Sequence, residues 1–248
     1  MLKYANRGVV LQELERWDEA LASYDRALVL RPDHMEWHLN RSAVCKALGQ
    51  WDEALASCDR AIALRPDSED AHFGRGTVLA EVGRYEEMLA EYDRAVALKP
   101  DFAEAQYNRA LALLLRGDYE RGWPSYEWRW ENYAKLSLEK RSFKQPLWLG
   151  ETSLAGKTLL VHSEQGLGDA IQFGRFIAAV ARRGTTVILE GQAPLVGLLD
   201  TLEGVSQVIS DGGPLPPFDY HCPIMSLPAA GAEKHPRHPP ACRALSAR

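Results

Sequence analysis

The sequence lacks a long apolar segment, an excess of positive charge and a regularly spaced set of cysteines. No apolar run reaches the roughly 18 residues that a membrane-spanning helix requires. The first seven residues also lack the apolar core of a signal peptide. We therefore expect a cytoplasmic protein without a membrane span. The net charge of −5 gives no electrostatic reason to expect nucleic acid as a partner.

The four cysteines show no paired spacing, which argues against a disulfide framework. Cys45 and Cys58 stand at apolar positions of a helical pattern, and we interpret them as small core residues. His235, His238 and Cys242 could suggest a metal, but they lack paired ligands and a scaffold. We expect neither a metal nor a resident cofactor.

A repeat dominates the first half of the chain. Related segments start at Trp17, Trp51 and Tyr85, a spacing of 34 residues, and a weaker copy starts at Tyr119. The first three segments each run on to an Arg/Lys-Pro-Asp sequence. A period of this length is typical of a helical hairpin that buries its apolar face only by stacking on its neighbours.

Punctuating residues mark the ends of the expected helices. Glycines lie just past three of the expected first helices, where a left-handed C-cap favours them, and prolines end the second helices. Aspartates after the prolines are the expected N-caps of the following helices. The residues are Gly49, Gly83 and Gly117; Pro32, Pro66 and Pro100; and Asp33, Asp67 and Asp101.

These features resemble the tetratricopeptide repeat family. The signature positions include Gly8, Ala20, Tyr24, Ala27 and Pro32, and they recur in the next two copies. The resemblance covers residues 1–134 and implies an α-solenoid of three full repeats and one degenerate repeat. It also implies that the first helix of each pair lines a concave surface that binds a protein or peptide.

The expected peptide-binding groove contains Asn6, Asn40, Phe73, Tyr107 and Asn108. The three asparagines share one repeat position, which Gly74 takes in the third copy, and resemble the asparagine ladder of protein O-GlcNAc transferases. An amide can hold a peptide backbone of any sequence because it both donates and accepts hydrogen bonds. The alternative is an inert exposed surface. The repeated Asp-Arg pairs of the second helices (residues 25–26, 59–60 and 93–94) are interpreted as a solvated face.

An aromatic segment breaks the repeat and leads into a junction, residues 135–154. Trp123, Tyr126, Trp130 and Tyr133 share a helical spacing. Pro124 predicts a kink or a restart of the helix. We interpret the aromatic residues as a cap that closes the solenoid and docks the next domain; a stacking platform for a sugar or base is the alternative.

Residues 155–228 are predicted to form an α/β half-domain with a Rossmann-like fold. The predicted strands are 158–162, 186–190 and 205–210, with helices at 170–183 and 194–202. Ser163 to Asp169 form a predicted loop at the strand–helix junction where α/β folds bind ligands. The candidate ligand-binding residues are His162, Glu164, Gln165, Gly166 and Gly168. Neither a dinucleotide nor a P-loop motif is completed here.

The segments Pro146–Glu151, Leu160–Asp169, Gln172–Phe176 and Phe218–Pro223 look like those of bacterial tetratricopeptide proteins with a C-terminal glycosyltransferase-like domain. That domain is similar to the heptosyltransferases, which have the GT-B fold and use a nucleotide sugar as donor. The resemblance implies that Asp169 is the catalytic base for an acceptor hydroxyl. The alternative is that Asp169 only caps the following helix.

Only the first of two Rossmann-like halves is recognisable, and residues 229–248 read as a disordered tail. We therefore expect a peptide-binding scaffold joined to an incomplete glycosyltransferase-like domain, inactive alone. The alternative is an active glycosyltransferase of which this chain is a fragment. An unpaired half-domain should also expose apolar surface and promote self-association.

Overall fold

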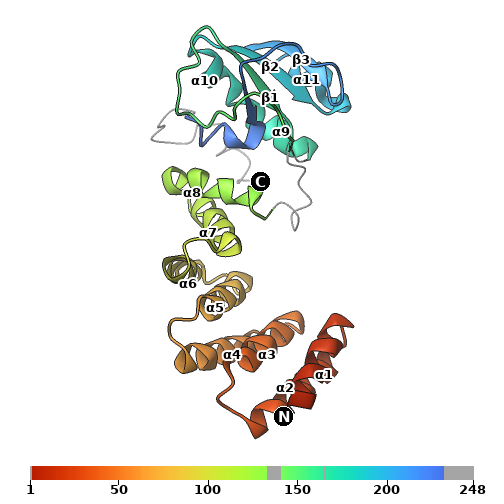
Figure 1. The fold of residues 1–248 in the computed structure, drawn as a ribbon, viewed down its shortest axis with the longest axis vertical. Helices are drawn as coiled ribbons and strands as arrows, with labels where there is room; N and C mark the ends of the chain where they lie inside the picture. Colours follow the sequence, from red (N-terminus) through yellow and green to blue (C-terminus); the bar gives the residue numbers. More distant parts are fainter. Residues whose placement is uncertain (1, 133–140, 165, 232–248) are drawn as a thin grey trace, which may run out of the picture. The chain divides into compact units, whose positions relative to one another are not determined.

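The computed structural model describes residues 2–132, 141–164 and 166–231. Its internal contacts separate two units, Met1–Arg129 and Trp130–Arg248, each described here by itself (Figure 1). No helix in these described ranges has the length and apolar character needed to cross a membrane.

Within residues 2–126 the N-terminal unit is a stack of four helical hairpins (Figure 1). The first helices are α1 (Leu2–Glu13), α3 (Met35–Ala47), α5 (Glu69–Glu81) and α7 (Ala103–Leu115). The second helices are α2 (Trp17–Leu30), α4 (Trp51–Leu64), α6 (Tyr85–Leu98) and α8 (Tyr119–Tyr126). The predicted helical solenoid is confirmed, with its core between successive hairpins.

The expected glycine turns inside the hairpins are also present. Gly49, Gly83 and Gly117 have φ angles of 71°, 73° and 81°, in the left-handed region that glycine adopts at little cost. The first hairpin has Glu15 at the equivalent position, with a φ of 55°. A glutamate in this conformation carries steric strain, so the first turn is the least favourable of the four.

The prediction that Asp33, Asp67 and Asp101 are helix N-caps is wrong by one residue. The N-caps of α3, α5 and α7 are His34, Ser68 and Phe102. Of these, Ser68 makes a side-chain cap, accepting a hydrogen bond from the Ala71 amide. Proline and aspartate together form the turn between repeats, so the helix starts later than the Pro-Asp pair suggests.

The last second helix passes through Pro124 instead of restarting there. α8 ends at Tyr126 and continues as a 3₁₀ helix, η1 (Glu127–Trp130). The rings of Trp123 and Tyr126 make an edge contact with centroids 6.0 Å apart. Tyr133 lies outside the described residues.

The C-terminal unit contains a parallel four-stranded sheet with strand order β3-β2-β1-β4. The strands are β1 (Thr158–His162), β2 (Thr186–Gly191), β3 (Val205–Ser210) and β4 (Tyr220–Pro223). The first three were predicted almost to the residue, whereas β4 was missed. Its four residues are a tyrosine, a histidine, a cysteine and a proline, so they form no apolar run that would predict a strand.

The helices of this unit are shorter than predicted. The helix expected at residues 170–183 is divided into α9 (Leu167–Gly174) and α10 (Ile177–Ala181). The helix expected at residues 194–202 is a 3₁₀ turn, η2 (Ala193–Leu195), followed by α11 (Val196–Leu199). α10 and α11 pack against β2 and β3. A last 3₁₀ turn, η3 (Ile224–Ser226), follows β4.

Part of the expected junction packs on this sheet. Leu147 forms a parallel bridge with His221 on the outer edge of β4, and the Trp148 amide donates to the His221 carbonyl at 2.9 Å. The Trp148 side chain is 1% exposed. Residues 146–148 therefore protect a sheet edge that would otherwise present unpaired backbone groups. The expected tail lies almost wholly outside the described residues.

Candidate functional site

The exposed side of the first helices is the candidate binding surface of the N-terminal unit. α1 contacts α3, and α3 contacts α5, more closely than the second helices contact one another. The first helices of the first three repeats therefore lie next to one another along the stack. Side chains spaced three or four residues apart remain exposed or half-buried on this side. We call them the first-helix face: Glu36, Asn40, Ala43, Ala47, Asp70, Gly74, Thr77, Glu81, Glu104, Asn108, Leu111 and Leu115.

Two of the predicted asparagines are anchored by buried tyrosines of the preceding second helix. Asn40 lies beside the Tyr24 hydroxyl, which donates to Gln12 Oε1 at 3.2 Å, and Asn108 lies beside the Tyr92 hydroxyl. Burial raises the pKa of Tyr92 to about 12, and the hydrogen bond to Asn108 partly opposes that rise. These amides are half-buried, which holds them in place while part of each still faces solvent. Asn6 is exposed on α1.

The gap in the asparagine series has a packing explanation. Cys58 replaces the tyrosine in the second repeat, and Gly74 replaces the following asparagine; a β-carbon on Gly74 would lie 3.7 Å from Cys58 Sγ. Cys58 in turn contacts Ser42, with Oγ and Sγ 3.0 Å apart. Without a tyrosine hydroxyl there is no need for an amide partner. The asparagines therefore have a structural role that periodicity did not reveal.

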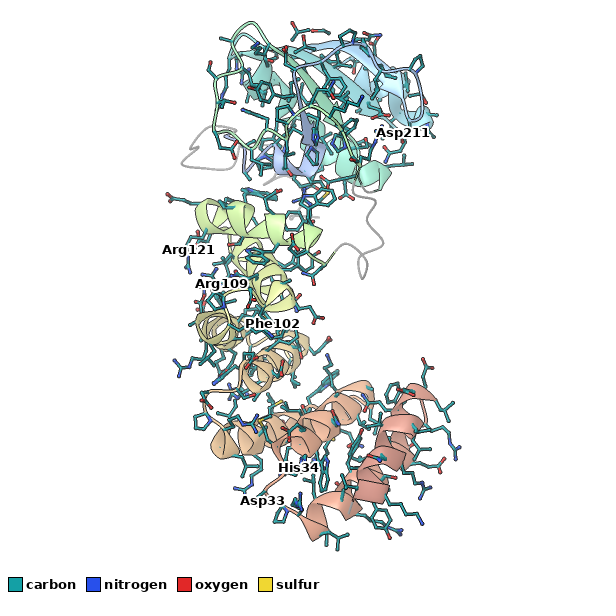
Figure 2. All side chains as sticks on the ribbon, in the orientation of Figure 1. Asp33, His34, Phe102, Arg109, Arg121 and Asp211 are labelled. Carbon is teal, nitrogen blue, oxygen red and sulfur yellow. The ribbon has the colours of Figure 1, made fainter. Side chains whose placement is uncertain are left out.

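Phe73 and Tyr107 are half-buried between hairpins. The Phe73 ring lies 5.0 Å from the Phe102 ring, which Figure 2 labels, and 5.9 Å from Tyr92. Tyr107 lies 5.7 Å from Tyr126. Both aromatic residues thus support the stack, and only their exposed edges remain for a ligand.

The aspartates interpreted as a solvated face form ion pairs between repeats. Asp25 pairs with Arg41 at 2.7 Å, and the next two repeats have the same pair 16 residues apart. Those pairs are Asp59 with Arg75 and Asp93 with Arg109. Figure 2 labels Arg109 and Arg121, which both lie within 4 Å of Asp93. The ladder fixes the register of each hairpin on the one before it.

Comparisons with known proteins agree with this geometry. Residues 6–69 match the family model described as tetratricopeptide repeat, and residues 76–117 match the one described as TPR repeat. The N-terminal unit carries tetratricopeptide repeats. The sequence has no significant match among curated proteins.

Several solved structures resemble the repeat unit. The crystal structure of MamA is 20% identical with a TM-score of 0.49, and the match covers 54% of this chain and 78% of that one. YrrB, described as a TPR protein with an unusual peptide-binding site, is 23% identical with a TM-score of 0.45 and coverages of 50% and 64%. The first TPR of Spaghetti (RPAP3), solved with an HSP90 peptide, is 22% identical with a TM-score of 0.45 and coverages of 47% and 92%.

The second candidate site lies at the carboxyl ends of β1 and β4. Glu164 follows β1, and its Oε1 accepts a hydrogen bond of 3.0 Å from the Met225 amide after β4. The loop after β1 is thereby tied to the turn after β4. Gly166 is the N-cap of α9, so Gly168 and Asp169 belong to the first helical turn and not to the predicted loop. Gln165 lies outside the described residues.

Asp169 makes the contact expected of a capping carboxylate. Its Oδ2 accepts a hydrogen bond from the Gly166 amide at 3.2 Å, at the N-terminus of α9. This contact accounts for an acidic residue at this position without catalysis. The catalytic role of Asp169 stays a prediction.

A cluster in which His162 is the one residue predicted as ligand-binding lies on the sheet face that Phe143 covers. Glu190 of β2 is 1% exposed and forms an ion pair with Arg141. His162 Nε2 lies 3.3 Å from His221 Nδ1 across β1 and β4, and the Phe143 ring contacts both imidazoles. Arg141 was assigned to the junction, so nothing in the sequence placed it beside a strand 49 residues later.

Burial and nearby charges shift the pKa values of groups in and beside this cluster. Burial, with Arg141 nearby, lowers the pKa of His221. Burial and the nearby Glu190 raise the pKa of Asp211, which Figure 2 labels, at the end of β3. The described residues contain no group of three His, Cys, Asp or Glu side chains arranged to hold a metal ion.

Proposed function

We propose that the N-terminal repeats bind an extended peptide segment of a partner protein along the first-helix face. The observation that carries this proposal is the row of exposed or half-exposed small and amide side chains that continues over α3, α5 and α7. Curved repeat arrays use such inner surfaces for binding.

The chemistry of this face suits a peptide backbone. Ala43 and Thr77 are small enough for a peptide main chain to approach. Leu111, which is 42% exposed, offers an apolar contact. Asn40 and Asn108, each held by a tyrosine, keep further amide hydrogen-bonding capacity for a backbone group. Acidic residues border this row at the N-terminal end of each helix (Glu36, Asp70 and Glu104), and Glu81 adds one at the C-terminal end of α5. We therefore propose that basic and aliphatic side chains flank the bound backbone.

A blocking substitution tests this proposal better than removal of asparagines, because Asn40→Ala would also affect Tyr24. We expect Ala43→Arg to weaken binding of a fluorescein-labelled nonapeptide of alternating lysine and leucine at least tenfold in fluorescence anisotropy. The matched control is Ala63→Arg, since Ala63 is an exposed alanine on the second helix of the same repeat. Equal binding by both variants, or tighter binding of the glutamate–leucine analogue, would contradict the proposed surface or its charge preference.

A glycosyltransferase-like role of the C-terminal unit is a second proposal. It is supported by the sequence motifs and by the strand order β3-β2-β1-β4, which matches the first four strands of the doubly wound order 3-2-1-4-5-6. In that order the direction reverses between β1 and β4, where Glu164 joins the two loops. A nucleotide sugar is the proposed donor of the enzyme, and we propose that this chain alone acts as a scaffold without turnover.

Nucleotide-sugar hydrolysis by the purified chain separates the scaffold from the enzyme. The scaffold proposal expects no release of nucleoside diphosphate above a heat-treated sample. Turnover that disappears in Asp169→Asn, but persists in the exposed-residue control Asp200→Asn, would overturn it in favour of the enzyme.

A further inference from the structure

His72 of α5 lies between two hydrogen-bond acceptors. Its Nδ1 is 2.6 Å from Glu91 Oε2 of α6, and its Nε2 is 3.0 Å from the Pro66 carbonyl oxygen in the turn before α5. The side chains of His72 and Glu91 are 12% and 18% exposed. Water therefore has little access to this histidine, and its two protein partners decide its hydrogen bonding.

Both contacts require a hydrogen on the imidazole ring. A carbonyl oxygen can only accept, so Nε2 of His72 donates to Pro66. Glu91 Oε1 accepts a hydrogen bond of 2.8 Å from Arg75, which holds Glu91 as a carboxylate, so its Oε2 is an acceptor as well. A neutral imidazole has one N–H and satisfies one of the two partners, whereas the imidazolium satisfies both.

The charges around this histidine favour the same protonation state. α5 contributes Arg75, α6 contributes Glu91, and α4 contributes Asp59, which lies 2.7 Å from Arg75. At the first turn of α5, Glu69 pairs with Lys99 at 3.6 Å and is already balanced. The single guanidinium is shared by two carboxylates, so a positive imidazolium beside one of them balances the cluster.

The second repeat has a histidine at the same position without the carboxylate. His38 Nε2 lies 2.9 Å from the Pro32 carbonyl oxygen, as His72 does from its own proline. Ser57 stands where the third repeat has Glu91. Burial lowers the pKa of His38, so this histidine favours the neutral form. One substitution in the facing helix, glutamate for serine, therefore separates the two histidines.

We propose that His72 is a proton-dependent lock of the third repeat. In its protonated form it joins α6 to the turn that precedes α5. After losing its proton it keeps one of the two hydrogen bonds, and a nitrogen lone pair then faces an oxygen. Because the folded repeat holds a proton that the unfolded chain has released, rising pH destabilises the folded repeat. The α5–α6 hairpin therefore opens more often as the pH rises through the range in which imidazole titrates.

The ring nitrogens of the unsubstituted full chain, labelled with ¹⁵N-histidine, test the protonation state directly. We expect two-bond ¹H–¹⁵N spectra at pH 7.0 to show both nitrogens of His72 protonated, and His38 as a neutral tautomer. The signals are assigned by their loss in His72→Gln and His38→Gln. A predominantly neutral imidazole at His72 at this pH overturns the proposal.

Amide hydrogen exchange tests the lock itself, with His72→Gln as the matched variant. Glutamine keeps a donor for Pro66, since Gln106 Nε2 donates to the Pro100 carbonyl at 2.9 Å from the equivalent position, and it cannot titrate. In the unsubstituted chain we expect the protection factors of α5 and α6 to fall about fivefold from pH 6.0 to pH 8.0. In His72→Gln the fall should be less than about twofold, whereas the control His38→Gln should keep it.

Glu91→Gln gives an independent variant on the facing helix. The amide removes the negative charge beside the imidazole, so the fall in protection between pH 6.0 and pH 8.0 should also become less than about twofold. The proposal is overturned if protection in the unsubstituted chain does not depend on pH. It is also overturned if the fivefold fall persists in both His72→Gln and Glu91→Gln.

Discussion

Gly76 lies directly beneath the ring of Tyr92, so that a β-carbon on residue 76 would stand 2.6 Å from Tyr92 Cε1. Gly8 and Tyr24 make the same contact, with a closest distance of 2.8 Å. In the repeat between them, Ser42 and Cys58 occupy the two positions, with Ser42 Oγ 3.0 Å from Cys58 Sγ. In the first and third repeats a tyrosine on the second helix thus stands against glycine on the first, and in the second repeat a cysteine stands against serine; the fourth repeat has Ala110 and Tyr126 at these positions.

This relationship predicts a coupling between residues 76 and 92. Gly76→Ser alone should destabilise the N-terminal unit by about 1–3 kcal/mol, because the added atoms overlap the tyrosine ring. Combined with Tyr92→Cys, which copies the Ser42–Cys58 pair, the same change should cost much less. Urea denaturation of the unsubstituted chain, the two single variants and the double variant gives the coupling free energy of this double-mutant cycle. Additive effects of the two substitutions would show that the contact does not decide the choice of residue.

The fold of the repeats was largely readable from the sequence because every hairpin repeats the same local solution. Glycine at residues 49, 83 and 117 and proline after the first three second helices mark turns whose backbone geometry few other residues fit. The cap positions were less predictable, since Asp33 and His34 are both plausible and only the geometry of the turn distinguishes them. Strand β4 has no apolar pattern and is recognised only through its pairing with β1.

The site was harder to predict because it depends on contacts between distant segments. Asn40 was recognised by its repeat position, but its contact with Tyr24 required the packing of one hairpin on the next. Arg141 and Glu190 meet only because residues 141–148 return to the sheet. Sequence periodicity predicts which face of a helix a residue occupies. A pair between distant segments depends in addition on how those segments are aligned in the folded chain.

The backbone conformation of Glu15 predicts that glycine at this position would stabilise the repeat unit. It has a φ of 55°, where Gly49, Gly83 and Gly117 stand in the other hairpins. Glu15→Gly should raise the free energy of unfolding by up to about 1 kcal/mol, since glycine removes the left-handed strain. The reciprocal change Gly49→Ala should lower it by a similar amount. The thermal midpoints of both variants check this, and a loss of stability in Glu15→Gly would contradict it.

The two carboxylates around Arg75 should differ in their contributions. Asp59 and Glu91 lie 2.7 and 2.8 Å from its guanidinium, but their side chains are 58% and 18% exposed. Asp59→Asn should cost at most about 1 kcal/mol and lose most of its effect at high salt. Glu91→Gln should cost about 1–3 kcal/mol, because it weakens contacts to both Arg75 and His72 in a drier environment. Urea midpoints at low and high salt compare them.

The repeat unit should lose stability in alkaline solution. Burial raises the pKa of the Cys58 thiol to about 11, with the Ser42 hydrogen bond opposing the rise; in an unfolded chain a thiol titrates near 8.5. Folding therefore favours the protonated thiol. This contribution is complete below about pH 8.5 and is lost, at roughly 1 kcal/mol per pH unit, as the pH rises towards 11. Cys58→Ala should show a shallower decline of the urea midpoint between pH 8 and 10.5, and an identical decline would refute this origin.

Alanine substitutions at the neighbouring residues Trp148 and Leu147 should destabilise the C-terminal unit to very different extents. The Trp148 side chain is 1% exposed, and its Nε1 donates to the Thr152 carbonyl at 2.9 Å, whereas Leu147 is 43% exposed. Trp148→Ala should therefore destabilise this unit by about 3–5 kcal/mol, while Leu147→Ala should change its stability by about 0.5 kcal/mol or less. Amide hydrogen exchange of β1 and β4 measures both, because it reports the opening of the sheet separately from the repeats. Unchanged protection in Trp148→Ala would mean that residues 146–148 are a linker resting on the sheet and not part of its core.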